Sequence, residues 1–198
     1  MQLTEIRVAG FGGQGVILSA IVLGKAASIY QHAFATMTQN FGPEARGGAC
    51  SAQLIVSETP VLYPYVTRPD ILVVMSQEAY VRFGPELKDG GILIVEQDMV
   101  RVSGLANASK VFSVPATRIA EELGKRMVLN SVMVGFFTAV TGLLEADAVR
   151  SAVADSVPAS FRELNLRAFE KGFEYGSAAE PATRAGTEHE AAVVYSQE

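Results

Sequence analysis

Residues 8–15, with the sequence Val-Ala-Gly-Phe-Gly-Gly-Gln-Gly, constrain the fold of this chain more than any other stretch. They follow an apolar run at residues 6–9 and precede apolar side chains that recur at helical spacing over residues 16–29. The predicted order is therefore strand, glycine turn and helix. The glycines match the G-x-G-x-x-G spacing, in which they permit a tight turn and a close approach of the backbone to an anion.

The free N–H groups and the positive dipole end of the predicted first helix lie directly after this turn. Such a helix end attracts a phosphate or a carboxylate. An alternative is that the glycines only let the helix pack closely on the strand. We predict a cofactor-binding turn made of Gly10, Gly12, Gly13, Gln14 and Gly15.

The residues after the second apolar run, residues 33–37, argue against the usual dinucleotide site. A nicotinamide or flavin site places an acidic residue there to bind the ribose hydroxyls. This chain instead has Thr38, Gln39 and Asn40, and the next acidic residue is Glu44. We therefore predict a Rossmann-like sheet that does not bind NAD in the usual way.

A polar loop at residues 38–48 is the second candidate for a binding site. Its proline and glycines allow a defined backbone geometry, and the guanidinium of Arg46 could bind a carboxylate or phosphate with two hydrogen bonds. The alternative is a surface ion pair between Glu44 and Arg46, which would contribute little stability. The predicted site residues in this loop are Glu44, Arg46, Gly47 and Gly48.

The rest of the chain alternates between apolar strands and helical patterns. Strands are predicted at residues 70–75, 92–95 and 110–114, and a hairpin is predicted from residues 49–56 through a turn at 58–60 to residues 61–63. Glu96, Gln97 and Asp98 follow one strand at its carboxyl end, where open α/β sheets usually bind ligands. A solvated loop is the favoured interpretation of them, and a ligand site is the alternative. Residues 128–141 form a helical pattern that is apolar on all sides, which requires that other elements cover it.

The predicted fold class is α/β, a Rossmann-like mixed, mainly parallel sheet with flanking helices and one hairpin. Residues 1–176 are predicted as a single domain. From residue 177 to 198 the composition shifts to Ala, Glu, Pro, Thr and Ser, which predicts a largely disordered tail.

The composition argues against several kinds of site. The net charge of −5 argues against nucleic acid as a partner. Cys50 is the one cysteine among 198 residues, so an intrachain disulfide or a cluster held by several thiolates is impossible. We predict no catalytic and no metal-binding residue, because no acid–base pair or metal-ligand spacing is found. The single cysteine is expected to be a packed small side chain.

Membrane and partner predictions follow from the apolar residues. No signal peptide and no apolar run long enough for a membrane span is found, so the cytoplasm is the expected place and no membrane is expected as a partner. The hydrophobic content of 49% is high for a chain surrounded by water alone. It indicates a buried interface with other subunits.

The two loop motifs together resemble the gamma subunit of the 2-oxoacid:ferredoxin oxidoreductases. The similarity includes GFGGQG and FGPEARGG, then Arg68-Pro69-Asp70, Gly90-Gly91, Asn130 with Gly135, and the stretch from Asn165 to Gly172. It covers about residues 3–176. The short chain and the Glu58-Thr59-Pro60 turn are most similar to the 2-oxoglutarate type, and the pyruvate and branched-chain types share the same motifs.

This resemblance implies a subunit of a larger enzyme that is not active alone. Alpha and beta subunits would hold thiamine diphosphate, and iron–sulfur clusters would lie on the beta subunit and on a ferredoxin-like chain. A ferredoxin-like delta subunit is therefore a further possible partner, and ferredoxin would accept the electrons. The implied reaction is oxidative decarboxylation of a 2-oxoacid with coenzyme A. Our hypothesis is that the glycine turn and Arg46 help to form the coenzyme A channel. The alternatives are a non-catalytic assembly module and a free-standing dinucleotide-binding oxidoreductase.

Overall fold

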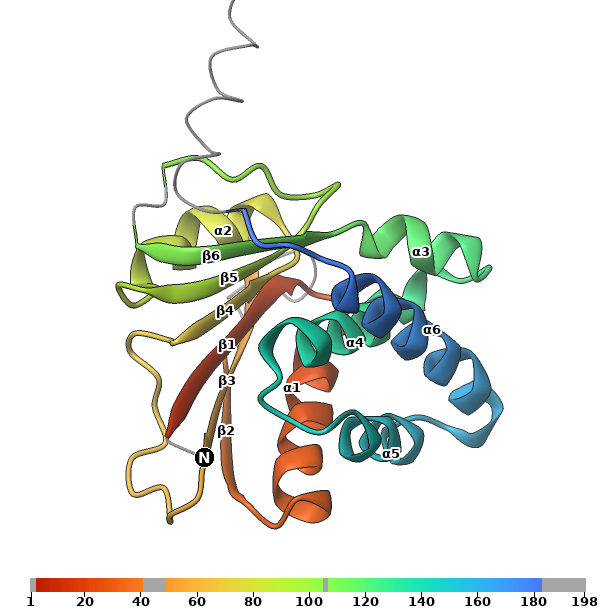
Figure 1. Cartoon of the computed structure of the whole chain (residues 1–198), viewed down its shortest axis with the longest axis horizontal. Coiled ribbons are helices and arrows are strands. Elements are labelled where there is room, and N and C mark those ends of the chain that lie inside the picture. The colour runs from red at the N-terminus through yellow and green to blue at the C-terminus, as the bar shows by residue number, and fades with distance from the viewer. Residues whose placement is uncertain (1–2, 41–48, 105–106, 183–198) are drawn as a thin grey trace, which may run out of the picture.

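A six-stranded mixed sheet forms the centre of the protein, as the computed structural model shows for residues 3–40, 49–104 and 107–182 (Figure 1). The strands are β1 (Thr4–Phe11), β2 (Phe34–Asn40), β3 (Ala49–Ser57), β4 (Ile71–Val74), β5 (Gly91–Glu96) and β6 (Ala108–Val114). Their order in the sheet is β2-β3-β1-β4-β5-β6. Strands β1, β4, β5 and β6 are parallel neighbours, and β3 runs antiparallel to both β1 and β2. The predicted mixed, mainly parallel sheet with one antiparallel hairpin is confirmed.

The helices are distributed unequally over the two faces of the sheet (Figure 1). On one face lie α1 (Val16–Lys25) with its π-helical extension η1 (Ala26–Tyr30), α4 (Leu129–Thr141), α5 (Ala146–Ser156) and α6 (Ala159–Ser177). On the other face lies α2 (Gln77–Phe83), followed by the short turn η2 (Gly84–Glu86). Helix α3 (Ala116–Glu122) extends past the carboxyl end of β6, and η3 (Arg126–Val128) leads from it into α4.

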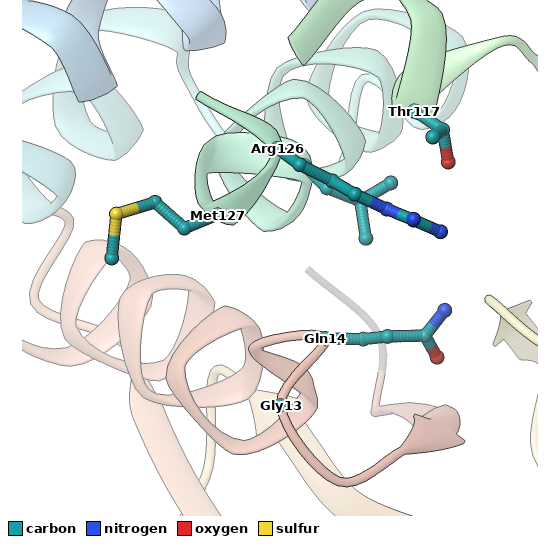
Figure 2. A pocket seen from close by; sticks show the side chains of 6 residues that line it. Gly13, Gln14, Thr117, Arg126 and Met127 are labelled. Atoms are coloured by element: carbon teal, nitrogen blue, oxygen red, sulfur yellow. The ribbon is translucent and has the colours of Figure 1, made fainter. Parts of the chain in front are cut away.

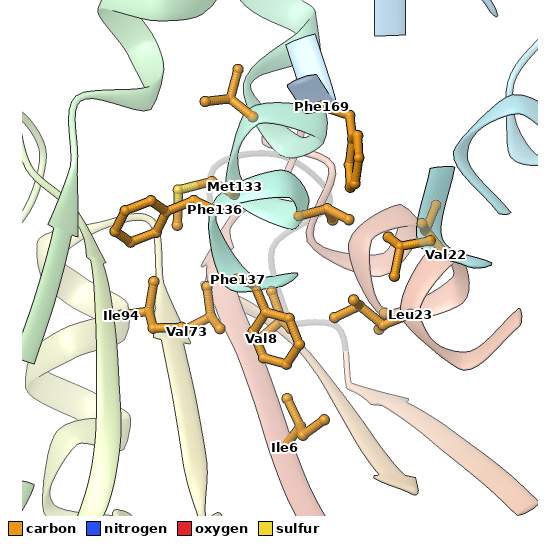
Figure 3. Close-up of a cluster of buried hydrophobic side chains, with 14 of the residues drawn as sticks. Ile6, Val8, Val22, Leu23, Val73, Ile94, Met133, Phe136, Phe137 and Phe169 are labelled. Atoms are coloured by element: carbon orange, nitrogen blue, oxygen red, sulfur yellow. The ribbon is translucent and has the colours of Figure 1, made fainter. Parts of the chain in front are cut away.

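The main hydrophobic core lies between the sheet and helices α1, α4 and α6 (Figure 3). Alternate residues of the strands point into it, because successive side chains of a strand face opposite sides. The strands contribute Ile6, Val8, Val73 and Ile94, and the helices contribute Leu23, Met133, Phe136, Phe137 and Phe169. Each of the first ten residues of helix α4 is buried, as its apolar circumference predicted.

Helices α4 and α6 approach each other through two glycines. A Cβ atom at Gly135 of α4 would lie 2.0 Å from the carbonyl oxygen of Phe169, and one at Gly172 of α6 would lie 2.0 Å from that of Val132. The two helix backbones are therefore in direct contact, and only glycine, which has no Cβ atom, permits so close an approach. Both glycines belong to the motifs on which the predicted family resemblance is based, and in this fold they serve packing.

The hairpin prediction named the wrong second strand. Residues 61–63 form no strand, and β3 pairs instead with β2, from Phe34 opposite Ser57 to Asn40 opposite Ser51. The other edge of β3 pairs with β1. Because a strand has only two edges, residues 61–63 have no free edge of β3 to join.

The described chain continues past the predicted domain boundary at residue 176. Helix α6 ends at Ser177, and Ala182 forms an isolated antiparallel bridge with Val111 of the edge strand β6. Residues 183–198 lie outside the described residues. Among the helices of the described part, none has the length and apolar character that a membrane crossing requires.

Candidate ligand site at the glycine turn

The glycine turn joins the carboxyl end of β1 to helix α1, as predicted. Gly13 and Gly15 have φ angles of 96° and 75°, in the left-handed region that favours glycine. Gly15 is the N-cap of α1, and none of the described side chains caps this helix or places a negative charge in its first turn. The first N–H groups of α1 are therefore available to an anion.

The side chain of Gln14 stabilises the turn through two hydrogen bonds to the backbone. Its Oε1 accepts a hydrogen bond from Phe11 N at 2.7 Å, and its Nε2 donates one to Met75 O at 2.8 Å. Gly10 leaves space for this amide, since a Cβ at position 10 would lie 2.5 Å from Gln14 Oε1. Gln14 therefore ties the end of β1 to the residue that follows β4.

This side chain lies at the point where open α/β sheets usually bind ligands. The helix after β1 covers one face of the sheet and the helix after β4 covers the other, so the crevice outside these neighbouring strands is a topological switch point (Figure 1). The side chain of Gln14 fills part of that crevice. The order of β1, β4, β5 and β6 is that of a dinucleotide-binding fold, whereas the antiparallel β3 occupies the place of the strand that usually provides the ribose-binding acid.

A cavity of about 260 Å³ opens beside the turn (Figure 2). It is lined by Gly13, Gln14, Thr117, Arg126, Met127 and Leu129. The side chains of Gln14, Thr117 and Arg126 extend into the same space from three different elements, whereas Met127 points away (Figure 2). Arg126 is exposed and forms no ion pair or hydrogen bond with any residue that the structure describes. Its guanidinium and the N-terminus of α1 make this cavity attractive to a phosphate or carboxylate.

The buried side chain of Glu96 holds Thr117, one of the residues that line the cavity, in position. Glu96 is the last residue of β5 and is fully buried, so the prediction of a solvated loop residue is wrong for Glu96, although Gln97 and Asp98 are exposed. Its Oε1 accepts a hydrogen bond from Thr117 N at 3.0 Å, at the start of α3. Its Oε2 has no hydrogen-bond partner among the described residues. The hydrogen bond satisfies one of the N–H groups that the start of a helix leaves without a partner inside the helix.

Asn130, in the first turn of helix α4, packs against the glycine turn. It is 3% exposed, and a Cβ at Gly15 would lie 2.6 Å from its Cβ and 3.1 Å from its Nδ2. Its neighbour Ser131 donates a hydrogen bond to Asn165 Oδ1 at 2.7 Å, and Asn165 Nδ2 donates to Phe161 O at 2.9 Å. The asparagine at position 165 is thus a satisfied core amide that fastens α6 to α4.

The structure places the first half of the predicted site and adds residues that the sequence did not indicate. Gly12 and Gly13 are exposed at the turn, next to the cavity that Gly13 and Gln14 line. Glu44, Arg46, Gly47 and Gly48 lie outside the described residues. Thr117 and Arg126 were missed because they come from a helix start and a short 3-10 turn more than a hundred residues from the glycine turn, and no local motif marks them.

Two other features that the sequence singled out, the Arg68-Pro69-Asp70 motif and Cys50, have structural roles in the described part of the chain. Arg68-Pro69-Asp70 lies at the amino end of β4, where Asp70 accepts hydrogen bonds from Glu5 N and Lys88 Nζ. Cys50 is a buried thiol on β3, as expected of a packed small side chain, and burial raises its pKa. No group of metal-ligating side chains occurs among the described residues.

The comparisons with known proteins agree with this fold and these motifs. A family model described as pyruvate ferredoxin/flavodoxin oxidoreductase matches residues 5–175. The 2-oxoglutarate synthase subunit KorC of Methanothermobacter thermautotrophicus is 50% identical over 176 residues, which cover 86% of this chain and 93% of that protein. The ketoisovalerate oxidoreductase subunit VorA of the same organism is 34% identical over 176 residues, which cover 86% of this chain and 36% of that protein.

A solved structure gives the same result at the level of the fold. The gamma subunit of a keto/oxoacid ferredoxin oxidoreductase from Geobacter sulfurreducens PCA is 37% identical, with a TM-score of 0.79, and the match covers 89% of this chain and 99% of that chain. The resemblance predicted from the two loop motifs is confirmed. The chain belongs to the pyruvate ferredoxin/flavodoxin oxidoreductase family.

Proposed function

We propose that this chain is the gamma subunit of a cytoplasmic 2-oxoglutarate:ferredoxin oxidoreductase and that its glycine turn forms part of the coenzyme A channel. The assembled enzyme would convert 2-oxoglutarate and coenzyme A to succinyl-CoA and carbon dioxide, and the electrons would pass to ferredoxin. The observation that carries the subunit assignment is 50% identity to a 2-oxoglutarate synthase subunit over 93% of its length. VorA, named for another 2-oxoacid, is only 34% identical.

Partner subunits would supply the carbon and redox chemistry. Thiamine diphosphate would stabilise the carbanion formed on decarboxylation, and the iron–sulfur clusters would remove electrons. We assign thiamine diphosphate to the alpha and beta subunits, and the iron–sulfur clusters to the beta subunit and to a ferredoxin-like delta subunit. The contribution of this chain is a surface beside the reacting groups.

The chemistry of the cavity supports coenzyme A as its occupant. Coenzyme A has a pyrophosphate and a 3′-phosphate, and each can accept hydrogen bonds from backbone amides and guanidinium groups. The turn offers uncapped N–H groups at α1, and Arg126 faces the same space without a partner among the described residues. Asn130 adds a buried amide directly beside Gly15.

The first test concerns the assembly. Native mass spectrometry of the tagged chain, isolated under anaerobic conditions from its source cells, should show two larger partners, with thiamine diphosphate and iron in the same eluate. A lone homo-oligomer without either cofactor would contradict the subunit assignment and favour a free-standing oxidoreductase. Saturable binding of NADH to the isolated chain would then support that alternative.

The second test concerns coenzyme A. In the assembled enzyme, Arg46→Ala should raise the KM for coenzyme A and leave the KM for 2-oxoglutarate nearly unchanged. Calorimetric titration with coenzyme A should show weaker binding to a Gly13→Asp enzyme, because the new carboxylate repels phosphates. If coenzyme A binding is unchanged in both variants while the complex dissociates, the chain is an assembly module without a ligand.

A further inference from the structure

Exposed hydrophobic side chains are found at the amino ends of the parallel strands, the end of the sheet opposite the glycine turn. Six of the nine large hydrophobic side chains that are exposed in the described part of the chain belong to segments at this end of the sheet. We call this group the apolar edge patch, and it consists of Leu3, Ile29, Phe34, Leu62, Tyr63 and Tyr65. Exposed hydrophobic residues that are grouped in one region of a surface indicate an interaction site, whereas single scattered ones do not.

The sheet register brings the segments of the patch together. Leu3 precedes Thr4, which pairs with Val56, and Phe34 pairs with Ser57. The loop that contains Leu62, Tyr63 and Tyr65 begins at the next residue after β3. The loop, the start of β1 and the turn from η1 into β2 all lie at the lower end of the molecule in Figure 1.

The central loop of the patch is held in place at both ends. At the first end, Thr59 N donates a hydrogen bond to Ser57 Oγ at 3.1 Å. At the second end, Val66 is buried, and its backbone forms two hydrogen bonds. Val66 N donates to Gln53 Oε1 at 2.9 Å, and Val66 O accepts from Arg7 Nη2 at 2.8 Å. Pro60 and Pro64 restrict the backbone between these anchors. A loop that is ordered before binding loses less conformational entropy when it binds.

The exposed side chains between the anchors are those that protein interfaces favour. Leu62 is 95% exposed and Tyr63 is 64% exposed, and the rings of Tyr63 and Tyr65 form an edge-to-face pair with centroids 5.6 Å apart. Residues 59–67 contain no charged side chain. Aromatic enrichment and charge depletion are typical of the buried centre of an interface.

We propose that the apolar edge patch docks this chain onto an uncharged apolar surface of the larger subunit of its oxidoreductase, an inference that rests on the proposed function. VorA gives the reason for this occupant, because the segment of VorA that matches this chain is only 36% of a longer polypeptide. In such a chain the domain is joined covalently to the remainder. A separate subunit lacks that high effective concentration and needs a non-covalent surface of its own.

The location of the patch separates docking from ligand binding. The glycine turn lies at the carboxyl ends of the parallel strands, and the patch lies at their amino ends. A substitution in the patch therefore leaves the turn and the cavity intact. Docking and coenzyme A binding become independently measurable.

The test compares Leu62→Asp with Val81→Asp in the co-expressed, anaerobically purified complex. Val81 is a matched control, since it is 66% exposed and lies on α2, outside the patch. Mass photometry should show at least a tenfold higher dissociation constant for Leu62→Asp and no change for Val81→Asp. Thermal melting of the isolated full chain should be equal for both variants and the wild type, because neither side chain is buried.

Each other outcome overturns the docking proposal in a recognisable way. If Leu62→Asp assembles as the wild type does, or Val81→Asp weakens assembly equally, the patch is not the docking surface and the proposed function stands. If the isolated chain forms a homodimer that Leu62→Asp abolishes, the occupant is a second copy. If even the wild type binds no larger subunit with thiamine diphosphate and iron, the proposed function falls as well.

Discussion

The backbone of Gly15 packs against the side chain of Asn130, and a Cβ at position 15 would lie 2.6 Å from the Cβ of Asn130. This contact joins the glycine turn to the first turn of α4, a helix more than a hundred residues later in the chain. The two residues belong to separate motifs of the family resemblance. Their contact explains why the turn needs glycine for packing as well as for backbone conformation.

The Gly15 contact predicts different effects for two neighbouring glycines. Gly15→Ala places an alanine in a left-handed backbone conformation and also introduces a clash with Asn130. It should therefore lower the free energy of unfolding by about 3 kcal/mol. Gly13→Ala is strained in the same way, but nothing lies within 4 Å of its Cβ position, and it should lower that free energy by about 1 kcal/mol. Urea denaturation of the isolated chain measures both, and equal losses would contradict the packing role of Asn130.

The contact between α4 and α6 predicts a severe effect of one methyl group. Gly135→Ala would place a Cβ 2.0 Å from a backbone carbonyl oxygen, so the helices must separate, and we expect a loss of about 3 kcal/mol in the free energy of unfolding. Gly24→Ala is the control. Its Cβ would meet only the side chain of Leu54, at 3.3 Å, and alanine gains helix propensity of up to about 1 kcal/mol. A Gly135→Ala chain that melts like the Gly24→Ala chain would disprove the tight packing.

Arg126 should contribute to coenzyme A binding in the assembled enzyme. Removing one charge-assisted hydrogen bond to a phosphate costs about 1.5 kcal/mol, so Arg126→Ala should raise the KM for coenzyme A about tenfold. Arg118→Ala removes the same charge nearby, but Arg118 already donates to Asp98 Oδ2 at 2.8 Å, and this variant should leave the KM unchanged. Equal effects of the two variants would indicate that positive charge attracts coenzyme A at long range, without a direct contact between Arg126 and a phosphate.

The Cys50 thiol should be unreactive in the folded chain. It is 7% exposed and burial raises its pKa, so modification by a disulfide reagent at pH 8 should be at least about a hundredfold slower than in denaturant, in proportion to the rarity of local opening. Rapid modification without denaturant would show that β3 opens readily.

The same pKa shift sets the direction of a pH effect. The folded chain holds the Cys50 thiol protonated at a pH at which the unfolded thiol, with a pKa of about 8.5, ionises. The free energy of unfolding should therefore fall as the pH rises above that value. A Cys50→Ala chain should lack this part of the pH dependence.

Local interactions determined the elements that the sequence predicted well. Ser76 caps α2 by accepting a hydrogen bond from Ala79 N at 3.2 Å, only three residues further along the chain. The glycine turn forms where its spacing predicted, and α1 begins directly after it. The apolar circumference of residues 128–141 required a covered helix, and α4 is that helix. In each case the contacts or the sequence pattern that determine the element involve residues close to one another in the chain.

Only the tertiary structure decided which distant segments meet. The insertion of β3 between β1 and β2 depends on hydrogen bonds between strands far apart in the chain, so residues 61–63 were mistaken for its partner. The burial of Glu96 depends on the position of α3, and the approach of Arg126 to the glycine turn depends on how η3 precedes α4. Sequence periodicity reports which face of an element is buried. The neighbour that buries it is set by the packing of the whole chain.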